Sequence, residues 1–221
     1  MNYPISEIFE TIQWEWRNTW KPSIFIRFWW CNLQCTWCDS KYSWDSKVEK
    51  AKNLDLQEIL EKIKLYKPKH IVFTWWEPTL FQKQIKEIQN NLWKEYTYEI
   101  ETNWSKEITE NLVFEQVNIS PKLSNSWNKK YNLDILNNTN YFTWNIDLKF
   151  VSDWSDLHEI KEEIQNIIKK YKINKIWIYI MPLWTTKESQ LNYKVLNFCI
   201  ENWYNYCLRE HIILFWDKKW V

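Results

Sequence analysis

The sequence contains no glycine, an absence that an ordinary globular chain of this length would not show. It has 0 glycines and 19 tryptophans among 221 residues, whereas average usage of about 7% predicts roughly 15 glycines. Tryptophan stands where a turn or a close backbone approach favours glycine, as in Thr74-Trp75-Trp76-Glu77-Pro78 and Asn103-Trp104-Ser105. We therefore hypothesise that most tryptophans stand for glycines, encoded by UGA codons that the source organism reads as glycine. The alternative is a genuinely tryptophan-rich chain without glycine.

The hypothesis leaves some tryptophans in place. Removing the roughly 15 missing glycines from the 19 tryptophans leaves about four, an ordinary number. We expect Trp37, Trp44 and Trp29 to be genuine, together with one of Trp144 and Trp177.

Other absences exclude whole classes of protein. The sequence has no apolar run near the roughly 18 residues of a membrane-spanning helix, and no signal peptide. A net charge of +1 provides no basic field for a nucleic acid or a membrane surface. Five cysteines, an odd number, argue against a disulfide framework and for a reducing cytoplasm. Because no linker, repeat or low-complexity block divides the chain, residues 1–221 are expected to form one domain.

Apolar runs and helical periodicity alternate along the sequence. Strands are expected at 24–28, 70–74, 96–101, 117–120, 146–151, 176–181 and 207–214, and helices at 54–65, 80–92, 157–168 and 189–202. Such alternation predicts an α/β fold whose mostly parallel strands are joined by right-handed crossovers. With roughly six or seven such units, the sheet is expected to form a partial barrel.

Several polar or reactive segments directly follow predicted strands. They are the cysteine-rich segment after residue 28, the turn Trp75-Trp76-Glu77, and the segments 101–103 and 120–122. Functional residues of parallel sheets gather at the carboxyl ends of the strands. These segments are therefore predicted to share one rim.

Cys31, Cys35 and Cys38 form a C-x3-C-x2-C motif, which is the strongest chemical signal in the chain. Thiolates select zinc or iron–sulfur clusters, and both kinds of site usually take four protein ligands. Three cysteines on one short loop indicate a [4Fe–4S] cluster with one iron open to another ligand. The alternative is a zinc knuckle completed by Cys199, Cys207 or a histidine, although Cys199 and Cys207 fit better as buried small hydrophobes.

The motif, with the aromatic Trp37 before its last cysteine, resembles the signature of the radical S-adenosylmethionine superfamily. The open iron of that family chelates S-adenosylmethionine and injects an electron into its sulfonium, and the resulting 5′-deoxyadenosyl radical abstracts a hydrogen atom. Thr74-Trp75-Trp76-Glu77-Pro78, with glycine restored, would read T-G-G-E-P and resembles the superfamily's second motif. The resemblance implies a partial (β/α) barrel of the radical S-adenosylmethionine type.

Further motifs narrow the resemblance. The segment 1–16 would end T-I-Q-G-E-G with glycine restored, and Phe25-Ile26-Arg27-Phe28 and the segment 37–44 follow it. Together with the segments 101–104, 120–122 and 211–221, they resemble the 7-carboxy-7-deazaguanine synthase family over nearly the whole chain. That family converts 6-carboxy-5,6,7,8-tetrahydropterin to 7-carboxy-7-deazaguanine, in a radical ring contraction that releases ammonia on the route to queuosine. Its cofactors are a [4Fe–4S] cluster, S-adenosylmethionine and Mg²⁺.

The resemblance implies roles for individual residues, none of them as a catalytic acid, base or nucleophile. The substrate would be contacted by Ile12, Gln13, Trp14, Arg27 and Thr74, with the Arg27 fork on the substrate carboxylate. S-adenosylmethionine would be bound by Trp37, Cys38, Asp39, Trp76, Glu77, Ser120, Pro121 and Lys122. The metal ligands would be Cys31, Cys35 and Cys38 for the cluster and the Ser40 hydroxyl for Mg²⁺.

Other candidates are weaker on sequence alone. His70 and His158 fit surface or packing positions better than ligand positions, and His211 fits a structural or a substrate-side role equally well. Asp147 and Lys149 could face the barrel mouth.

The resemblance further implies a small-molecule substrate, an electron donor such as flavodoxin or ferredoxin, a homodimer, and no nucleic-acid or membrane partner. The alternative functions are another small radical S-adenosylmethionine enzyme, such as a glycyl-radical activase, and a zinc-stapled binding module. An activase needs a protein-docking surface, whereas Gln13, Arg27 and the hydroxyl of Ser40 suit a small anionic substrate with a cation.

Overall fold

Strands alternate with helices over most of the chain. The computed structural model describes residues 1–38, 51–74, 77–92, 94–128, 145–152, 157–171 and 177–215. The strands are β1 (Tyr3–Ile12), β2 (Pro22–Phe28), β3 (Lys52–Leu54), β4 (His70–Thr74), β5 (Thr97–Thr102), β6 (Gln116–Ile119), β7 (Asn145–Ser152), β8 (Trp177–Pro182) and β9 (Asn205–Tyr206). The helices are α1 (Leu56–Leu65), α2 (Gln82–Leu92), α3 (Leu157–Tyr171), α4 (Lys187–Gln190), α5 (Tyr193–Asn202) and α6 (Glu210–Phe215), with short 3₁₀ helices at Pro78–Phe81 and Ser124–Ser126.

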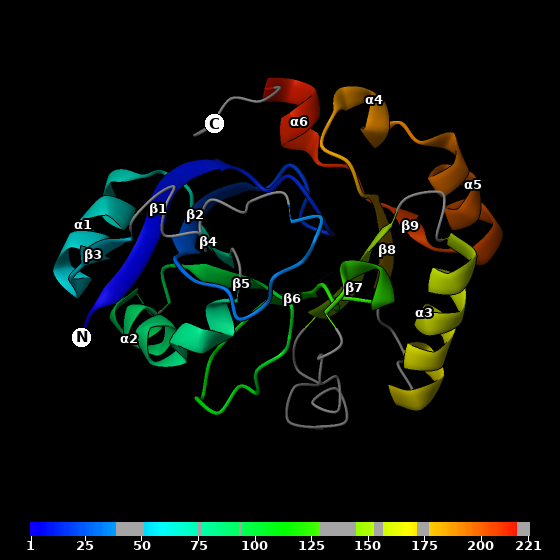
Figure 1. The fold of residues 1–221 in the computed structure, drawn as a ribbon. Coiled ribbons are helices and arrows are strands. Elements are labelled where there is room, and N and C mark those ends of the chain that lie inside the picture. The colour runs from blue at the N-terminus through cyan, green and yellow to red at the C-terminus, as the bar shows by residue number, and fades with distance from the viewer. Residues whose placement is uncertain are drawn as a thin grey trace.

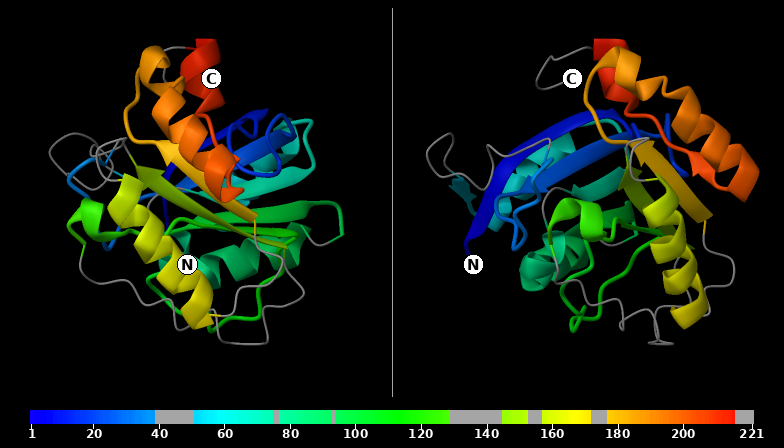
Figure 2. Two further views of the ribbon diagram at one scale, coloured as in Figure 1. Left: turned by 90° about the vertical axis from the view of Figure 1, so that its right-hand side faces the viewer. Right: turned by 45° about the vertical axis from the view of Figure 1, so that its right-hand side comes forward.

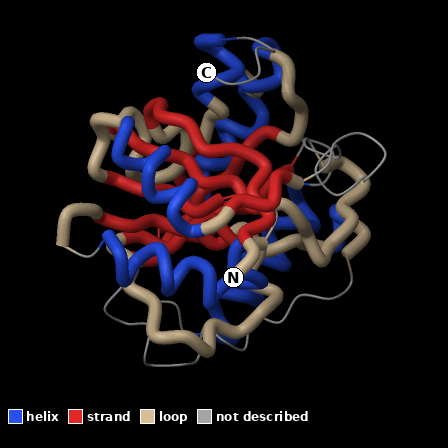
Figure 3. The backbone as a smooth tube through the Cα atoms, turned by 90° about the vertical axis from the view of Figure 1, so that its left-hand side faces the viewer, coloured by secondary structure: helices blue, strands red, loops and turns tan. Residues whose placement is uncertain are grey.

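The described strands form one open sheet in the order β3-β1-β2-β4-β5-β6-β7-β8-β9. From β2 to β9 every neighbouring pair is parallel, whereas β1 runs antiparallel to β2 and β3. The sheet is curved, and α1, α2, α3 and α5 lie along its outer side (Figures 1 and 2). Figure 3 shows the strands gathered in the middle with the helices around them. This arrangement confirms the prediction of an α/β partial barrel with mostly parallel strands.

Helix α1 illustrates how the sequence specifies the outer layer. Asp55 caps its amino end by accepting a hydrogen bond from the Glu58 backbone N–H at 2.9 Å, and the Glu58 side chain bonds back to the Asp55 N–H at 2.8 Å. Ile59, Leu60 and Ile63 form the buried face of the helix and join the main hydrophobic core. No helix among the described residues is long and apolar enough to cross a membrane.

The inner, concave face of the sheet carries buried polar side chains, whereas the outer face packs into the apolar core. On β5, Ile100 packs outward into the main core, whereas Glu99 is fully buried on the other face. Neighbouring strands repeat this alternation, with Asn118 on β6 and Asp147 and Lys149 on β7 buried on the inner face. Buried carboxylates and amides need partners, because an unpaired buried polar group costs free energy. The buried polar side chains of the inner face are therefore candidates for an active site.

The segment 207–214 was expected to be a strand, and this prediction is wrong. The chain forms the short strand β9 before it, and residues from Glu210 onwards form helix α6. A short apolar run does not distinguish a strand from a buried helix. In this case α6 rests against the segment after β1, where the Glu210 N–H donates to the Trp14 carbonyl at 3.3 Å.

Seven non-glycine residues in the described chain have a positive φ, and six of them are tryptophans. They are Trp16 (69°), Trp20 (76°), Trp30 (128°), Trp104 (57°), Trp127 (60°) and Trp203 (60°), and the seventh is Lys94 (72°). A left-handed backbone costs an L-residue about 1–2 kcal/mol, whereas glycine adopts it freely. Trp127 and Trp203 also end helices in the left-handed conformation, where glycine is commonest. The backbone thus favours glycine at these six positions, as the composition hypothesis predicts.

Candidate active site

The cysteine loop, residues 29–38, follows the carboxyl end of β2. Cys35 is buried, and Cys31 and Cys38 are partly exposed. Two sulfurs accept N–H groups, since the Leu33 backbone donates to Cys31 Sγ at 3.3 Å and the Asn128 amide donates to Cys35 Sγ at 3.0 Å. Burial raises the pKa of the Cys31 thiol to about 12, so a bound metal would be needed to hold it as a thiolate at neutral pH.

The spacing of the three thiols bears on the kind of metal centre. In the described part of the chain, no three Cys, His, Asp or Glu side chains converge on a position for a single ion. Zinc needs all its ligands around one centre, with sulfurs about 2.3 Å away. Three thiols on one loop are the donor set of a [4Fe–4S] cluster with one iron left open, whereas a structural zinc site takes a fourth protein ligand.

Glu77 ties the rim together at the carboxyl ends of β4 and β5. Its Oε1 accepts the Thr79 N–H at 3.1 Å, the Thr79 hydroxyl at 2.5 Å and the Thr102 hydroxyl at 2.5 Å. Its Oε2 accepts the Asn103 N–H at 2.8 Å. The carboxylate is fully buried, and burial raises its pKa. Among the described residues one donor contacts Oε2, so Glu77 is a candidate for binding an ammonium group.

Asn103 joins this rim to the cysteine loop, because its amide Nδ2 donates to Asn32 Oδ1 at 3.4 Å. Asn32 in turn donates to the Ser105 hydroxyl at 2.7 Å. The segments that follow β2, β4 and β5 are thus in contact, as the rim prediction requires.

Trp37 and the segment after β6 form the other side of the rim. The Trp37 indole N–H donates to the Asn125 carbonyl at 2.9 Å, and Lys122 Nζ lies 5.7 Å from the centre of a Trp37 ring. Lys122 also donates to the Ser120 hydroxyl at 2.8 Å. Trp37, Ser120 and Lys122, which the resemblance assigns to S-adenosylmethionine, therefore lie together beside the cysteines.

The segment 13–21, which we call the floor loop, joins β1 to β2 at the end of β2 opposite the cysteine loop. It is closed by the Gln13 N–H donating to the Lys21 carbonyl and the Trp20 N–H donating to the Gln13 carbonyl, both at 2.8 Å. The Gln13 amide oxygen accepts the backbone N–H groups of Trp14 and Glu15 at 2.8 and 3.3 Å. The amide N–H₂ of the same side chain donates to Glu99 and Glu101 on β5, so the loop lies against the inner face of the sheet.

Charged side chains fill the interior between the floor loop and the rim. Lys149 on β7 forms an ion pair with Glu15 of the floor loop, and the pair lowers the pKa of Glu15 and raises that of Lys149. Glu101 on β5 accepts the Thr74 hydroxyl at 2.5 Å and the Gln13 amide at 3.1 Å. Burial and the nearby Glu15 carboxylate raise the pKa of Glu101 to about 7. This carboxyl therefore exchanges its proton near neutral pH.

A second ion pair anchors the floor loop on β7. Arg17 donates to Asp147 Oδ1 at 2.6 Å. Burial raises the pKa of Asp147 to about 6 despite the guanidinium beside it. The floor loop thus meets the strands through paired charges rather than through apolar packing alone.

Arg27 on β2 projects into the same interior and has a partner on β1. One of its N–H groups donates to Glu7 Oε2 at 2.7 Å. Its guanidinium lies over the Phe9 ring at 4.7 Å and over a Trp14 ring at 5.6 Å. The planar guanidinium fork matches a carboxylate, so Arg27 is a candidate for binding an anionic ligand.

Two indoles occupy the space between these charges. The buried Trp14 side chain stacks on Phe25 at 5.0 Å and lies 4.8 Å from the His211 ring. The buried Trp16 ring lies 4.1 Å from Lys149 Nζ. Neither indole N–H has a hydrogen-bond partner in the structure as described. Glycine at positions 14 and 16 would open space beside the Arg27 guanidinium and the Lys149 ammonium.

Comparisons with known proteins show what this chain is similar to in sequence. The family model described as the radical SAM superfamily matches residues 26–120. A 7-carboxy-7-deazaguanine synthase of Buchnera aphidicola subsp. Schizaphis graminum is 33% identical over 222 residues, covering 92% of this chain and 94% of the relative. The chain belongs to the 7-carboxy-7-deazaguanine synthase family.

Two further comparisons support the family assignment and the fold. The family member of Clostridium acetobutylicum is 33% identical over 192 residues, with 83% of this chain and 82% of the relative covered. The crystal structure of QueE from Escherichia coli superposes with a TM-score of 0.71, at 22% identity, over 96% of this chain and 95% of that chain. At that identity the structural likeness concerns the fold.

Most of the site residues that were expected from the sequence lie on the rim or around the interior. Asp39, Ser40 and Trp76 fall outside the described residues. Cys199 and Cys207 are buried, as expected of small hydrophobes. His158 is exposed, and His70 is buried with hydrogen-bond partners, which are a surface and a packing position respectively.

Sequence reasoning missed several interior residues, chiefly Glu7, Glu15 and Glu99, and left Asp147 and Lys149 undecided. A signal was present, because Glu99 and Glu101 on one strand, and Asp147 and Lys149 on another, recur with the period of two that puts them on one face. Polar residues at that period in otherwise apolar strands indicate a polar interior.

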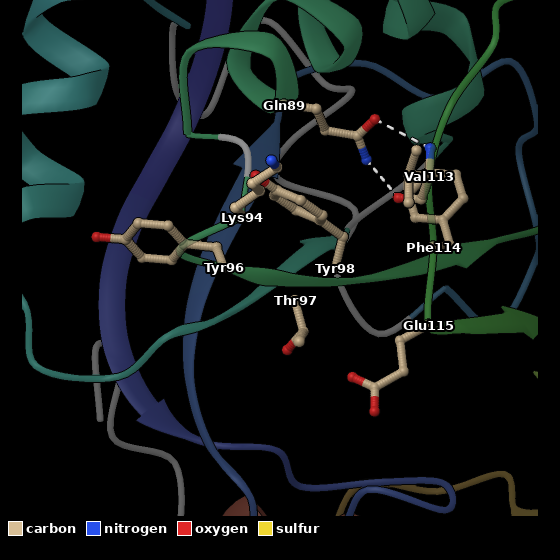
Figure 4. A pocket seen from close by; sticks show the side chains of 8 residues that line it. All are labelled: Gln89, Lys94, Tyr96, Thr97, Tyr98, Val113, Phe114 and Glu115. Carbon is tan, nitrogen blue, oxygen red and sulfur yellow. Dashed lines mark hydrogen bonds between the residues drawn. The ribbon is translucent and has the colours of Figure 1, made fainter.

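The described chain also has a cavity of about 320 Å³ at the amino ends of β5 and β6. Figure 4 shows its lining of Gln89, Lys94, Tyr96, Thr97, Tyr98, Val113, Phe114 and Glu115. The Gln89 amide is engaged with the Val113 backbone through two hydrogen bonds. Tyr96, Tyr98 and Phe114 of this lining belong to the main hydrophobic core on the outer side of the sheet, so the cavity is separate from the charged interior of the candidate active site.

Proposed function

We propose that this chain converts 6-carboxy-5,6,7,8-tetrahydropterin to 7-carboxy-7-deazaguanine, with loss of ammonia, in queuosine biosynthesis. The observation that carries the proposal is the cysteine loop above a buried, charged interior, in a chain that belongs to the 7-carboxy-7-deazaguanine synthase family. A glycyl-radical activase is not favoured, because the similar curated proteins are 7-carboxy-7-deazaguanine synthases.

Cys31, Cys35 and Cys38 would hold the [4Fe–4S] cluster. When bound there, the cluster and S-adenosylmethionine would supply one-electron radical chemistry for hydrogen abstraction from the substrate. The N–H groups on Cys31 and Cys35 stabilise sulfur-centred negative charge, as hydrogen bonds to cluster sulfurs do.

The rim would bind S-adenosylmethionine. We assign its ammonium to Glu77 Oε2, and its adenosine side to Trp37, Ser120, Pro121 and Lys122. Cys38 would contribute through the backbone of the loop. Asp39 and Trp76 are proposed for the same site from the family resemblance.

The interior would bind the pterin. Backbone groups of Ile12, Gln13 and residue 14 would face the ring, Thr74 would contact it from β4, and Arg27 would pair with its carboxylate. The Gln13 side chain would not bind the pterin, because both its amide N–H groups and its oxygen are hydrogen-bonded within the protein. Glycine at positions 14 and 16 provides the space for a bicyclic ring.

The remaining assignments rest on the resemblance. The Ser40 hydroxyl is proposed to ligate Mg²⁺, which usually keeps water and takes substrate oxygens as further ligands. We also propose a homodimer in the cytoplasm that receives electrons from flavodoxin or ferredoxin. The unbroken strand order from β3 to β9 supports a single domain over residues 1–221.

An anaerobic assay tests the proposed function. The protein is made with glycine in place of the tryptophans that are expected to stand for it, and we call it the glycine-bearing protein. It is reconstituted with iron and sulfide and incubated with the pterin, S-adenosylmethionine, Mg²⁺ and a reductant. The product is followed by mass spectrometry. We expect 7-carboxy-7-deazaguanine from the parent protein and none from Cys35→Ala. An intact cluster without product would favour another radical S-adenosylmethionine reaction over the proposed one. A colourless protein that holds one zinc ion would refute the cluster.

A further inference from the structure

Glu99 on β5 is a fully buried carboxylate with four hydrogen-bond donors. Its Oε1 accepts the Gln13 amide at 2.5 Å and the Asn118 amide at 2.5 Å. Its Oε2 accepts the Asn18 amide at 2.6 Å and His70 Nε2 at 3.0 Å. A carboxylate has about four acceptor sites, so all of them are filled by protein groups.

Two of the four donors belong to the floor loop. Gln13 lies at the beginning of the loop and Asn18 just past its middle, whereas Asn118 and His70 belong to the neighbouring strands β6 and β4. Glu99 therefore connects the loop to three adjacent strands through one side chain. No other anchor of the loop in the described structure holds both of these loop residues.

A carboxylate at position 99 has a specific consequence for the orientation of the Gln13 amide. A glutamine amide has a donor and an acceptor end, and a carboxylate accepts only. The Glu99 carboxylate thus requires the Gln13 N–H₂ to face β5, which turns the amide oxygen toward the Trp14 and Glu15 backbone N–H groups. The carboxylate of Glu99 in this way sets the backbone orientation at the start of the floor loop.

A stable core alone does not require this arrangement. Burying a carboxylate costs several kcal/mol before its partners compensate, and apolar residues of similar volume often serve stability equally well or better. The pattern of donors instead fits a requirement for one loop geometry. The backbone held in this way is the segment 12–14, to which the proposed function assigns the pterin.

We propose that Glu99 is a positioning residue for the pterin, because it holds the floor loop in the geometry that receives the ring. This inference rests on the proposed function. Glu99 does not contact the substrate, since its four acceptor sites are taken by Gln13, Asn18, His70 and Asn118.

The test compares Glu99→Gln with a matched control in the glycine-bearing protein. Glu99→Gln replaces one carboxylate oxygen with an N–H₂ group, which cannot accept the N–H groups of the floor loop or of the strands that Glu99 accepts. We expect the KM for the pterin to rise about tenfold or more, as after loss of a hydrogen bond to a charged group. We also expect kcat, iron content and S-adenosylmethionine cleavage without pterin to stay close to the parent values. Glu115→Gln removes the half-exposed Lys21–Glu115 ion pair at the same loop and should leave KM unchanged.

Two further measurements keep the proposal open to refutation. Asn18→Ala leaves the carboxylate with three donors, so it should fold even if Glu99→Gln does not, and it should raise KM in the same direction. Hydrogen exchange of amides 13–21 should quicken in Glu99→Gln and in Asn18→Ala but not in Glu115→Gln.

The outcomes separate this inference from the proposed function. If the parent protein makes no product, the proposed function fails, and the exchange of the floor loop still reports whether Glu99 holds it. Parental KM and parental exchange in both Glu99→Gln and Asn18→Ala would overturn the inference. So would a loss of thermal stability and of cluster content in parallel with the rise in KM, because that pattern marks a purely structural residue.

Discussion

At the scale of single residues, tryptophan in the left-handed backbone region is the most unusual property of this chain. Six of the seven positive-φ residues in its described part are tryptophans, and two of these, Trp127 and Trp203, are also largely exposed. An exposed indole gains little from burial, so it offers no compensation for the strained backbone. Trp37 differs, because its indole N–H is hydrogen-bonded and its φ is not positive.

Peptide mass spectrometry of the protein purified from its own source gives the first prediction. We expect glycine at positions 16, 20, 30, 104, 127 and 203, where the backbone is left-handed, and tryptophan at position 37. Tryptophan at most of the six positions would refute the reading of UGA as glycine.

The second prediction concerns the stability effect of a single substitution. Trp203→Gly removes the strain of a left-handed backbone, which costs an L-residue about 1–2 kcal/mol. Against this gain, glycine loses roughly 0.5–1 kcal/mol more conformational entropy on folding. We therefore expect the free energy of unfolding to rise by about 0.5–1 kcal/mol in urea denaturation. Trp184→Gly is the matched control, since Trp184 is also exposed and its φ is not positive. That variant should be destabilised, and a destabilised Trp203→Gly would contradict the argument.

At the scale of elements, the strands and helices with strong periodicity were predictable and the ends of the chain were not. β4, α1 and α3 were expected almost as they are, because apolar residues recur at the period of the element. β1 was missed, since its buried positions include Glu7, whose partner Arg27 comes from the paired strand. A charge that becomes acceptable only through its tertiary partner leaves no apolar signal in the sequence.

Arg27 provides a prediction for the β1–β2 pair. Arg27→Lys keeps the positive charge and its attraction to Glu7 but loses the planar fork, so we expect the KM for the pterin to rise about tenfold or more. Cluster content should not change. Glu7→Gln removes the ion pair and leaves the fork intact, and its effect on KM should be smaller. Equal effects of the two variants in steady-state assays would show that Arg27 acts only through Glu7.

Glu101 provides a prediction for the interior of β5. Its pKa is raised from 4.5 to about 7, so between these pH values the folded protein retains a proton that the unfolded chain releases. Stability therefore falls as pH rises through this window. Glu101→Gln removes the titrating group and should make the decrease shallower in urea denaturation across the same range. The exposed Glu107→Gln serves as control, and an unchanged slope in Glu101→Gln would contradict the raised pKa.

At the scale of the whole molecule, the site lies between the rim and the floor loop, and the two were unequally predictable. The rim followed from sequence, because motif residues come directly after parallel strands and must meet at one edge. The charged interior did not, because it depends on pairs such as Glu15 with Lys149 and Gln13 with Glu99, which are far apart in the chain. The cysteines specified the class of chemistry, and the interior adds the geometry for a small anionic substrate.

The most direct measurement of the central claim is the stoichiometry of product and ammonia formed by the glycine-bearing enzyme under anaerobic conditions. The account predicts one 7-carboxy-7-deazaguanine and one ammonia for each carboxytetrahydropterin consumed. The printed, tryptophan-bearing chain should form neither, because the Trp14 and Trp16 indoles fill the interior. Unreacted pterin beside an intact [4Fe–4S] cluster and bound S-adenosylmethionine in the glycine-bearing enzyme would contradict it.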